Sequence, residues 1–364
     1  MGGEPLVWML LGDKRGDNAQ VEVLAESLGW SCQRREIRMR EPWVIGKPRV
    51  KPTLHHVDLS RSDPLEPPWP DLILTIGRRP SMASLWVREQ SGGHTKIALL
   101  GKPSGMTEHF DLIVVSAEAQ LPPLPNVMCI GLPLLRADEQ ALAAAADKWR
   151  EPFAVLPRPL IGILIGGPTG PFVYDASVGR RLLDRTAEVI ADGGTPYLTT
   201  SRRTPENLVK RLEAELPQGA QLFQWAPDRA DNPYLGLLAH GDGFVVTGDS
   251  ISMLVEVARR GRPLGILSLP HGALGGLDLL RRAFLRRLFA PGSGSSADRR
   301  RRLALTLHRM RLVSHTRDFR ALHGLLVESG FAVRDGERLE EPSGRVPDDL
   351  PQVVARVRAL LEAT

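Results

Sequence analysis

The chain has 364 residues, of which 42% are hydrophobic and 24% are charged, the balance of an ordinary globular protein. Since one domain usually takes about 100–200 residues, this length favours two domains. The formal net charge of +5 is too small to indicate a nucleic-acid-binding protein, and two distant cysteines, Cys32 and Cys129, argue against a disulfide framework or a structural zinc site. No apolar stretch approaches about 20 residues and residues 1–11 lack signal-peptide features, so we expect a cytoplasmic protein.

In the first half of the chain, short apolar runs end at Gly- or Ser-rich turns, and amphipathic segments follow them. This rhythm predicts parallel β/α units whose strands are buried on both faces. The runs lie at 6–11, 72–76, 97–100 and 112–115. An Ala-rich segment at 137–150 then predicts a helix, and the three prolines of residues 151–159 predict a linker.

A second series of apolar runs follows the proline-rich segment. Its runs lie at 160–165, 196–199, 221–224, 243–246 and 264–267. Residues 291–300 are rich in Gly and Ser and predict a flexible excursion, and the pattern of 351–361 predicts a terminal helix. We therefore expect an α/β fold with two Rossmann-like, doubly wound domains facing a central cleft. The expected domains are residues 1–150 and 159–340, followed by a helix within 350–364.

The turn after the first run is a candidate site, because ligands of open α/β sheets bind at the carboxyl ends of strands. Its polar and glycine residues are Asp13, Lys14, Gly16, Asp17, Asn18 and Gln20. Backbone N–H groups at a helix N-terminus attract an anion, and Lys14 adds positive charge. Asp17 then serves as a base or holds a sugar hydroxyl. The alternative is a tight turn in which Asp17 or Asn18 caps the helix.

Two strand-end turns of the second series carry features of a phosphate site. These features are Gly166, Gly167, Ser201, Arg202 and Arg203. Paired glycines permit the close approach of a phosphate or a sugar, or they form a plain turn. The serine and arginines offer a hydroxyl and bidentate donors to a diphosphate. Thr204 is also predicted as the N-cap of the next helix, with Pro205 as its first residue.

The turn at 247–256 is the most specific candidate. A helix begins at its hydroxyl-rich end, where free N–H groups with Asp249, Ser250 and Ser252 are predicted to hold a diphosphate. Farther along that helix, Glu256 is predicted to accept both hydroxyls of a ribose. The alternative makes Asp249 or Ser250 a cap and Glu256 a solvated residue. Residues 225–228 and 232–234 either read a nucleobase or form a packed proline turn.

These blocks together resemble the family of the plant mitochondrial fission factor that is named for its elongated-mitochondria phenotype, together with its bacterial relatives. The matching segments span nearly the whole chain. They are GDKRGDNAQ at 12–20, PDLILTIGRR at 70–79, IGGP at 165–168, TSRRTP at 200–205, DNPYLGLLA at 231–239, VTGDSISMLVEVARRGRP at 246–263, DFRALHGLL at 318–326 and DGERLE at 335–340. The pattern is also similar to that of GT-B glycosyltransferases such as the enzyme that completes lipid II.

The resemblance implies a donor nucleotide in the C-terminal domain, an acceptor in the N-terminal domain, and a last helix that packs back on the N-terminal domain. The leading hypothesis is glycosyl transfer from a nucleoside-diphosphate-sugar, with no cofactor and no metal ligand among the residues singled out. Residues 249–252 with Arg202 and Arg203 stabilise the leaving diphosphate, and Asp17 is the base. The alternatives are a non-catalytic scaffold that recruits a partner to a membrane surface, and a nucleotide-sugar epimerase.

Residues 279–289 alternate arginine pairs with apolar residues at near-helical spacing. On a helix, Leu280, Phe284, Leu285 and Leu288 share one side, and the arginines flank it. Such a helix either lies on an anionic bilayer as a peripheral contact or packs its apolar side on its own domain. A lipid-linked acceptor gives the membrane contact a purpose; no contact with nucleic acid is expected.

Overall fold

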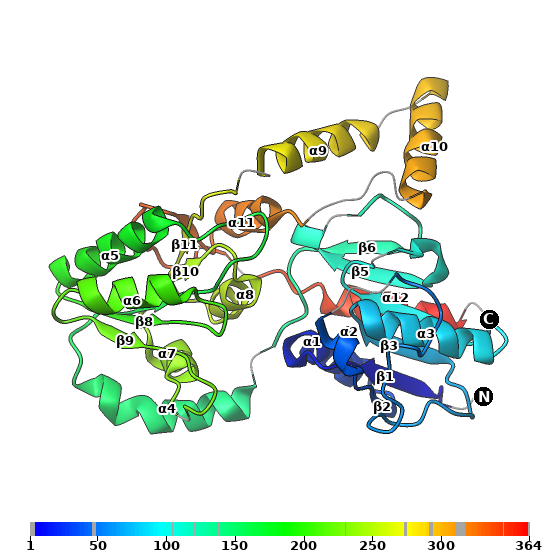
Figure 1. The fold of residues 1–364 in the computed structure, drawn as a ribbon, viewed down its shortest axis with the longest axis horizontal. Coiled ribbons are helices and arrows are strands. Elements are labelled where there is room, and N and C mark those ends of the chain that lie inside the picture. The colour runs from blue at the N-terminus through cyan, green and yellow to red at the C-terminus, as the bar shows by residue number, and fades with distance from the viewer. Residues whose placement is uncertain are drawn as a thin grey trace. The chain divides into compact units, whose positions relative to one another are not determined.

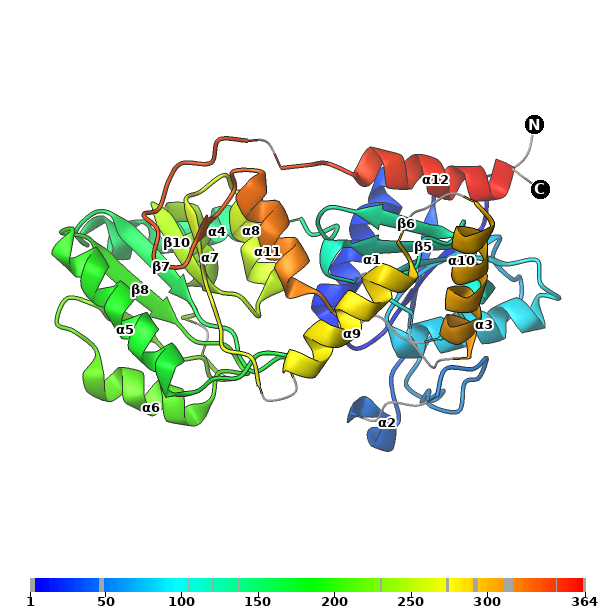
Figure 2. The ribbon, with the colours of Figure 1, turned by 90° about the horizontal axis from the view of Figure 1, so that it is seen from above.

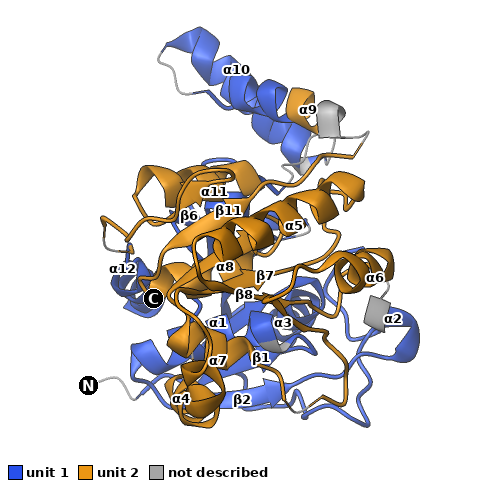
Figure 3. Cartoon of the chain, turned by 90° about the vertical axis from the view of Figure 1, so that its left-hand side faces the viewer, with its two compact units in different colours: residues 1–136, 282–318, 347–364 blue, residues 137–281, 319–346 orange. Residues whose placement is uncertain are grey.

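The computed structural model describes residues 4–45, 49–103, 105–119, 121–136, 138–229, 231–272, 275–290, 294–310, 317–344 and 346–362. The chain forms two compact units (Figure 3). Unit 1 contains residues 1–136, 282–318 and 347–364, and unit 2 contains residues 137–281 and 319–346. Each unit has one six-stranded parallel sheet with helices on its faces, which is the predicted pair of Rossmann-like domains (Figure 1).

The sheet of unit 1 has the order β2-β1-β3-β4-β5-β6. Its strands are β1 (Val7–Leu11), β2 (Cys32–Glu36), β3 (Leu72–Ile76), β4 (Lys96–Leu100), β5 (Leu112–Ser116) and β6 (Val127–Ile130). Its helices are α1 (Arg15–Leu28), α2 (Glu41–Ile45), α3 (Arg78–Gln90), α10 (Ser295–Arg309), α12 (Leu350–Glu362) and two 3₁₀ turns, Thr107–His109 and Ala117–Ala119. The central strand β3 is buried along its whole length, as its apolar run predicts.

The terminal helix α12 belongs to unit 1. Val353 and Val357 are fully buried in the core cluster to which α1, β1 and β3 contribute. The helix α12 packs against α1 (Figure 2). The Asp349 carboxylate, just before the helix, accepts a hydrogen bond of 2.8 Å from the backbone N–H of Gly131. The last described helix therefore completes a core whose other members come from the first 136 residues.

The sheet of unit 2 has the order β12-β11-β10-β7-β8-β9. Its strands are β7 (Leu160–Leu164), β8 (Thr195–Thr199), β9 (Gln221–Phe223), β10 (Gly243–Thr247), β11 (Leu264–Leu267) and β12 (Val333–Arg334). Its helices are α4 (Glu139–Ala154), α5 (Ala176–Ala191), α6 (Glu206–Glu215), α7 (Tyr234–His240), α8 (Ile251–Arg259) and α11 (Phe319–Glu328). The helix α9 (Gly275–Leu288) contains the boundary between the units.

The predicted domain boundary at residue 150 and the linker at 151–159 are wrong, since α4 continues through Pro152 to Ala154 and lies in unit 2. Packing explains why the proline does not end the helix earlier. The ring of Phe153 is buried, stacks on Trp149 at 5.0 Å, and meets Tyr197 edge-on. This anchor compensates for the backbone hydrogen bond that proline cannot make.

The predicted second domain at 159–340 and the excursion at 291–300 also need correction. Residues 282–318 belong to unit 1, and α10 begins at Ser295. The backbone N–H of Asp298 bonds to the Gly294 carbonyl, so the serines form a first helical turn. Ala304 of α10 is fully buried, which gives the helix a packed face that composition alone did not reveal.

Candidate functional site

The strand order of unit 2 marks one place for a ligand. The chain adds β8 on one side of β7 and later adds β10 on the other side, so the order of strands reverses between β7 and β10. Ligands of open parallel sheets bind outside the carboxyl ends of strands at such a switch point. The loops that follow β7 at Gly166 and β10 at Gly248 meet there.

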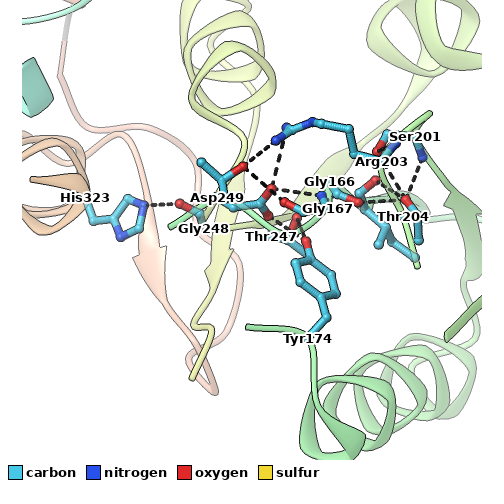
Figure 4. A network of polar contacts seen from close by, with 12 residues as sticks. Gly166, Gly167, Tyr174, Ser201, Arg203, Thr204, Thr247, Gly248, Asp249 and His323 are labelled. Atoms are coloured by element: carbon cyan, nitrogen blue, oxygen red, sulfur yellow. Dashed lines mark hydrogen bonds and ion pairs between the residues drawn. The ribbon is translucent and has the colours of Figure 1, made fainter. Parts of the chain in front are cut away.

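Asp249 joins these two loops from inside the protein (Figure 4). Its buried carboxylate accepts a hydrogen bond of 2.9 Å from the backbone N–H of Gly167 and one of 2.6 Å from the Tyr174 hydroxyl. Burial raises the pKa of Tyr174, and the charge of Asp249 raises it further, so this hydroxyl remains a donor. Asp249 therefore faces protein groups, and its observed contacts are structural.

The paired glycines allow the loops to close on one another. A Cβ on Gly166 would overlap the Asp249 carboxylate, and a Cβ on Gly167 would overlap the backbone carbonyl of Arg203. The Gly166 N–H also donates to the Thr247 hydroxyl at 2.8 Å. The glycines are thus required by close loop packing, which brings the β7, β8 and β10 loops together.

The loop after β8 lies against the glycine pair. Arg203 donates to the Thr169 hydroxyl, and its Nη2 is 3.7 Å from Oδ2 of Asp249, while about half of its side chain is exposed. Ser201 is half-buried and Arg202 is exposed. The loop therefore presents two guanidinium groups at the carboxyl edge of the sheet.

The expected cap at Thr204 is wrong. The helix α6 begins at Glu206 with Pro205 as its N-cap, because the Thr204 hydroxyl is used elsewhere. It accepts the Ser201 backbone N–H at 2.8 Å and donates to the Gly166 carbonyl at 2.7 Å. Thr204 thus ties the β8 loop to the glycine loop.

The helix α8 opens directly at the switch point. Its N-cap, Ser250, is buried and makes no side-chain capping bond. The first turn of α8, all of whose residues the structure describes, contains no acidic residue. Ser252 is exposed on that turn. The partial positive charge of a helix N-terminus is therefore not neutralised by a side chain of α8 itself.

Gly248 fixes the approach to this helix. Its carbonyl accepts a hydrogen bond of 2.8 Å from Nε2 of His323, and a Cβ at this position would overlap the same imidazole ring. Neither His323 nor Tyr174 was predicted from the sequence. His323 bonds to Gly248 and Tyr174 bonds to Asp249, and both pairs are far apart in the sequence. No local sequence pattern indicates either contact.

Glu256 lies farther along α8 and is half-buried. It accepts a hydrogen bond from the Tyr234 hydroxyl, at the start of α7. Burial raises the pKa of Glu256, and this hydrogen bond acts in the opposite direction. The carboxyl group is held in place, so the alternative of a freely solvated helix residue does not apply.

The first candidate loop lies at the corresponding switch point of unit 1, between β1 and β3. The helix α1 begins at Arg15, and its N-cap Lys14 makes no side-chain capping bond, so neither Asp17 nor Asn18 is the cap. Asp17 is half-exposed in the first turn, 3.6 Å from the Lys14 amine. Asn18 is buried and donates to the Gly12 carbonyl at 2.8 Å.

The remaining residues of this loop are accessible. Gly16 has open space around its Cβ position, Gln20 is half-buried, and Asp13 lies 3.6 Å from a guanidinium nitrogen of Arg38. In this loop the Asn18 amide points inward, whereas the carboxylates of Asp13 and Asp17 remain accessible to solvent.

The structure adds two arginines that the site prediction missed. Arg78 and Arg79 open α3 directly after β3, and a Cβ on the preceding Gly77 would lie 4.0 Å from the Asp17 carboxylate. Burial lowers the pKa of Arg79, and the charge of Asp13 opposes this shift. The signal was present, since an apolar run ending in Gly-Arg-Arg is a strand end that opens a helix.

The comparison with protein families identifies the relatives of this fold. Residues 15–287 match the family model described as Mitochondrial fission ELM1. The chain belongs to this family. Mitochondrial fission protein ELM1 of Arabidopsis thaliana is 27% identical over 224 residues, covering 56% of this chain and 52% of the plant protein. Uncharacterized protein RP120 of Rickettsia prowazekii (strain Madrid E) is 19% identical over 301 residues, covering 73% and 84%.

The match of this ELM1-family chain thus spans about half the length of the plant relative. Among solved structures, UDP-GlcNAc 2-epimerase from Methanocaldococcus jannaschii aligns with a TM-score of 0.50 at 10% identity, covering 98% of this chain and 99% of that one. Together with the two parallel six-stranded sheets, this confirms the predicted GT-B fold.

The apolar residues of α9 differ in exposure. Leu285 and Leu288 are buried, at 3% and 9% exposure, whereas Leu280 and Phe284 are 70% and 54% exposed. Helical spacing still places the four residues within about 140° of one another, as predicted, but the protein covers only two of them. The exposed pair is accompanied by exposed arginines at 281, 286 and 287.

Two properties concern the described residues alone. Within them, no three His, Cys, Asp or Glu side chains gather as a metal-binding group. Among the described helices, none has both the length and the apolar character needed to cross a bilayer.

Proposed function

We propose that unit 2 binds a nucleoside-diphosphate-sugar at the carboxyl ends of β7, β8 and β10, and that the protein transfers the sugar to an acceptor hydroxyl. The observation that carries this proposal is the meeting, at the switch point, of the glycine loop and the start of α8, with Arg203 beside both. The N-terminus of α8 supplies backbone N–H groups and Arg203 supplies guanidinium donors to a diphosphate, whereas the N–H groups of Gly166 and Gly167 already bond to Thr247 and Asp249. The fold relative described as a UDP-GlcNAc 2-epimerase supports this ligand class.

In the proposed transfer, the acceptor oxygen forms a bond to the anomeric carbon of the sugar. The bond from that carbon to the diphosphate breaks, and its electron pair leaves on the diphosphate. The N-terminus of α8, Ser252, Arg202 and Arg203 stabilise the charge that develops there. Asp17 is the proposed general base that takes the acceptor proton.

The proposal is tested by calorimetry with UDP, ADP and GDP on the intact protein. We expect at least one diphosphate to bind, and Arg203→Ala to weaken that binding about 10- to 100-fold, because a charge-assisted hydrogen bond is lost. The matched control is Arg180→Ala, an exposed arginine of α5 in the same unit. If none of the three diphosphates binds the parent, the proposal is wrong.

Epimerisation is the second candidate, favoured by the fold relative. Nuclear magnetic resonance of UDP-GlcNAc incubated with the protein distinguishes the two reactions. An epimerase converts the sugar to its C2 epimer without an acceptor, whereas a transferase leaves that centre unchanged. A binding protein of this family that recruits a partner produces no turnover of any nucleotide sugar.

We further propose that the exposed side of α9 contacts an anionic bilayer. Leu280 and Phe284 lie one helical turn apart, and the exposed arginines match a negative surface. Co-sedimentation with phosphatidylglycerol vesicles should exceed that with phosphatidylcholine vesicles at low salt. Phe284→Ser should reduce it, whereas Leu59→Ser, at another exposed leucine, should not. Equal retention by both vesicle types would contradict this contact.

A further inference from the structure

An open cavity of about 470 Å³ lies in unit 1, at the edge of the sheet where β1, β3 and β4 begin. The strands are parallel, so this edge is opposite to the one that carries the loops after β1 and β3. The volume falls in the range of about 300–1,000 Å³ that is typical of small-molecule sites. The polar and aromatic side chains on its wall are Trp30, Asp71, His94, Lys96, Arg358 and Glu362.

Asp71 gives one side of this cavity a fixed shape. Its Oδ2 accepts the backbone N–H of Leu6 at 2.8 Å, and its Oδ1 lies 2.7 Å from Nε2 of His94. The backbone carbonyl of Asp71 also accepts the Lys96 backbone N–H at 2.8 Å. Both carboxylate oxygens therefore have partners within the protein. The imidazole of His94 is oriented by one nitrogen and keeps Nδ1 for a further hydrogen bond.

The other charged groups on the wall keep part of their hydrogen-bonding capacity. Nζ of Lys96 lies 3.9 Å from Oδ1 of Asp111, which is beyond hydrogen-bond range. Arg358 donates from Nη2 to the Leu28 carbonyl at 2.7 Å, and a guanidinium group has five N–H donors in all. Within the described part of the chain, Glu362 has no hydrogen-bond or ion-pair partner. The cavity thus presents both unused donors and an unused acceptor.

Trp30 supplies the apolar part of the wall. Its side chain is half-buried and packs against the core cluster of unit 1, and Cζ of Arg358 lies 5.8 Å from the centre of its ring. Pro5 and Leu361 add further apolar surface to the cavity. A ligand in this cavity therefore meets an indole and aliphatic groups as well as charged side chains.

The balance of charge on the wall decides which class of ligand fits. Lys96 and Arg358 carry two positive charges, and Asp71 and Glu362 carry two negative charges, so neither sign of ligand is selected. A hydroxyl group both donates and accepts a hydrogen bond, so it fits a wall that offers donors and acceptors together. The C–H face of a sugar ring, in turn, is an apolar surface that fits an indole.

We propose that this cavity binds a neutral sugar in its pyranose form. The hydroxyls of the sugar contact Lys96, Arg358 and Glu362, and its C–H groups contact Trp30. Among the described residues, none of unit 2 and none of the loop at 12–20 lines the cavity. The sugar bound here is therefore held without a nucleotide and is not the one that reacts, so this site is independent of the proposed nucleotide site.

Saturation-transfer difference nuclear magnetic resonance of the intact protein with glucose, galactose, mannose and N-acetylglucosamine tests the proposal. We expect at least one of these sugars to bind. Lys96→Met and Glu362→Ala should each raise its dissociation constant about 5- to 10-fold, because each variant removes a hydrogen bond to a hydroxyl. Trp30→Ala should raise it at least as much. The matched controls are Lys51→Met and Glu66→Ala, at exposed residues of the same unit, which should bind as the parent does.

The dependence on salt reports the class of ligand. Binding of a neutral sugar should change little between about 0.1 M and about 1 M sodium chloride, because salt screens interactions between charges. Citrate, an anion, and glycine, a zwitterion, are the comparison probes. If either of them binds in a manner that Lys96→Met abolishes, and none of the four sugars binds, the cavity takes an ionic ligand and the proposal is wrong.

The remaining outcomes separate this inference from the proposed function. If a sugar binds and no nucleoside diphosphate does, the nucleotide site is wrong and the sugar site stands; the reverse result rejects the sugar site alone. Sugar binding that both Lys96→Met and Glu362→Ala leave unchanged, or that UDP abolishes, lies elsewhere and contradicts the proposal. Should Trp30→Ala lose its native circular dichroism, the variants at the partly exposed Lys96 and the exposed Glu362 still decide the matter.

Discussion

Asp249 shows that a sequence can place a residue at a strand end without showing where its side chain points. The turn after β10 is predictable because an apolar run ends there, but the direction of the carboxylate is not. It points inward because Gly167, 82 positions earlier, and Tyr174, 75 positions earlier, supply its donors. Long-range partners of this kind leave no local signature, so the sequence could place the loop at the site but could not assign the side chain.

Gly167→Ala should destabilise unit 2. The added methyl meets the Arg203 backbone, which cannot rotate away as a side chain does, and overpacking of this kind costs about 1–3 kcal/mol. Chemical denaturation measures the loss. Gly324→Ala on α11 is the control, because its Cβ position is in ordinary contact only and alanine favours a helix. Equal stability of the two variants would contradict the packing argument.

Glu256 also makes a pH-dependent contribution to folding. Burial raises the pKa of Glu256 above the ordinary value of 4.5, so folding favours the protonated form of this group relative to the unfolded chain. The contribution of protonated Glu256 to the free energy of unfolding is fully present below pH 4.5. It is lost as the pH rises through the pKa of Glu256 in the folded protein. The unfolding free energy of Glu256→Gln should therefore fall less than that of the parent over this range, and Glu151→Gln, at an exposed glutamate of α4, should follow the parent.

At the level of elements, the sequence predicted the strands that lie inside the sheets and missed three at the edges. β3, β7 and β10 are buried throughout and appear as apolar runs. β2 has the sequence CQRRE, β6 contains the exposed Cys129, and β12 has two residues. An edge strand has one neighbour and more contact with water, so β2 can be largely polar, and β6 and β12 are too short, at four and two residues, to give a clear pattern, whereas the edge strand β9 was predicted.

The terminal helix α12 offers a direct test of element packing. Val357→Ala removes two methyl groups from a fully buried position and should lower the unfolding free energy by about 2 kcal/mol. Gln352→Ala, on the exposed side of the same helix, should change it little. Thermal unfolding monitored by circular dichroism makes the comparison. A small loss in Val357→Ala would show that α12 contributes little to the core.

For the whole molecule, neither unit is one continuous stretch of chain, and this limits how well the domain boundaries can be predicted from the sequence. Unit 1 takes three segments and unit 2 takes two, with junctions after residues 136, 281, 318 and 346. A length-based division into consecutive domains cannot anticipate this arrangement. The sequence therefore predicted two Rossmann-like domains, and the family resemblance predicted the return of the last helix to the first, but the boundary near 136 and the place of 282–318 in unit 1 were not anticipated.

A fragment of residues 1–136 should accordingly fail to unfold cooperatively. It contains all six strands of its sheet but lacks Leu350, Val353 and Val357, which are buried members of the same core cluster. Adding a synthetic peptide of residues 347–362 should increase the sharpness of the urea transition. A sharp transition in the fragment alone would mean that the first 136 residues form a self-sufficient core.

The position of α12 has a consequence for biosynthesis. A ribosome produces the sheet of unit 1 first and the helix that covers part of its core more than 200 residues later. During that interval the apolar surface awaiting Val353 and Val357 is exposed to other nascent chains and to chaperones. The part of the protein that is translated first is therefore the part that matures last, and stalled translation before residue 350 leaves unit 1 unfinished.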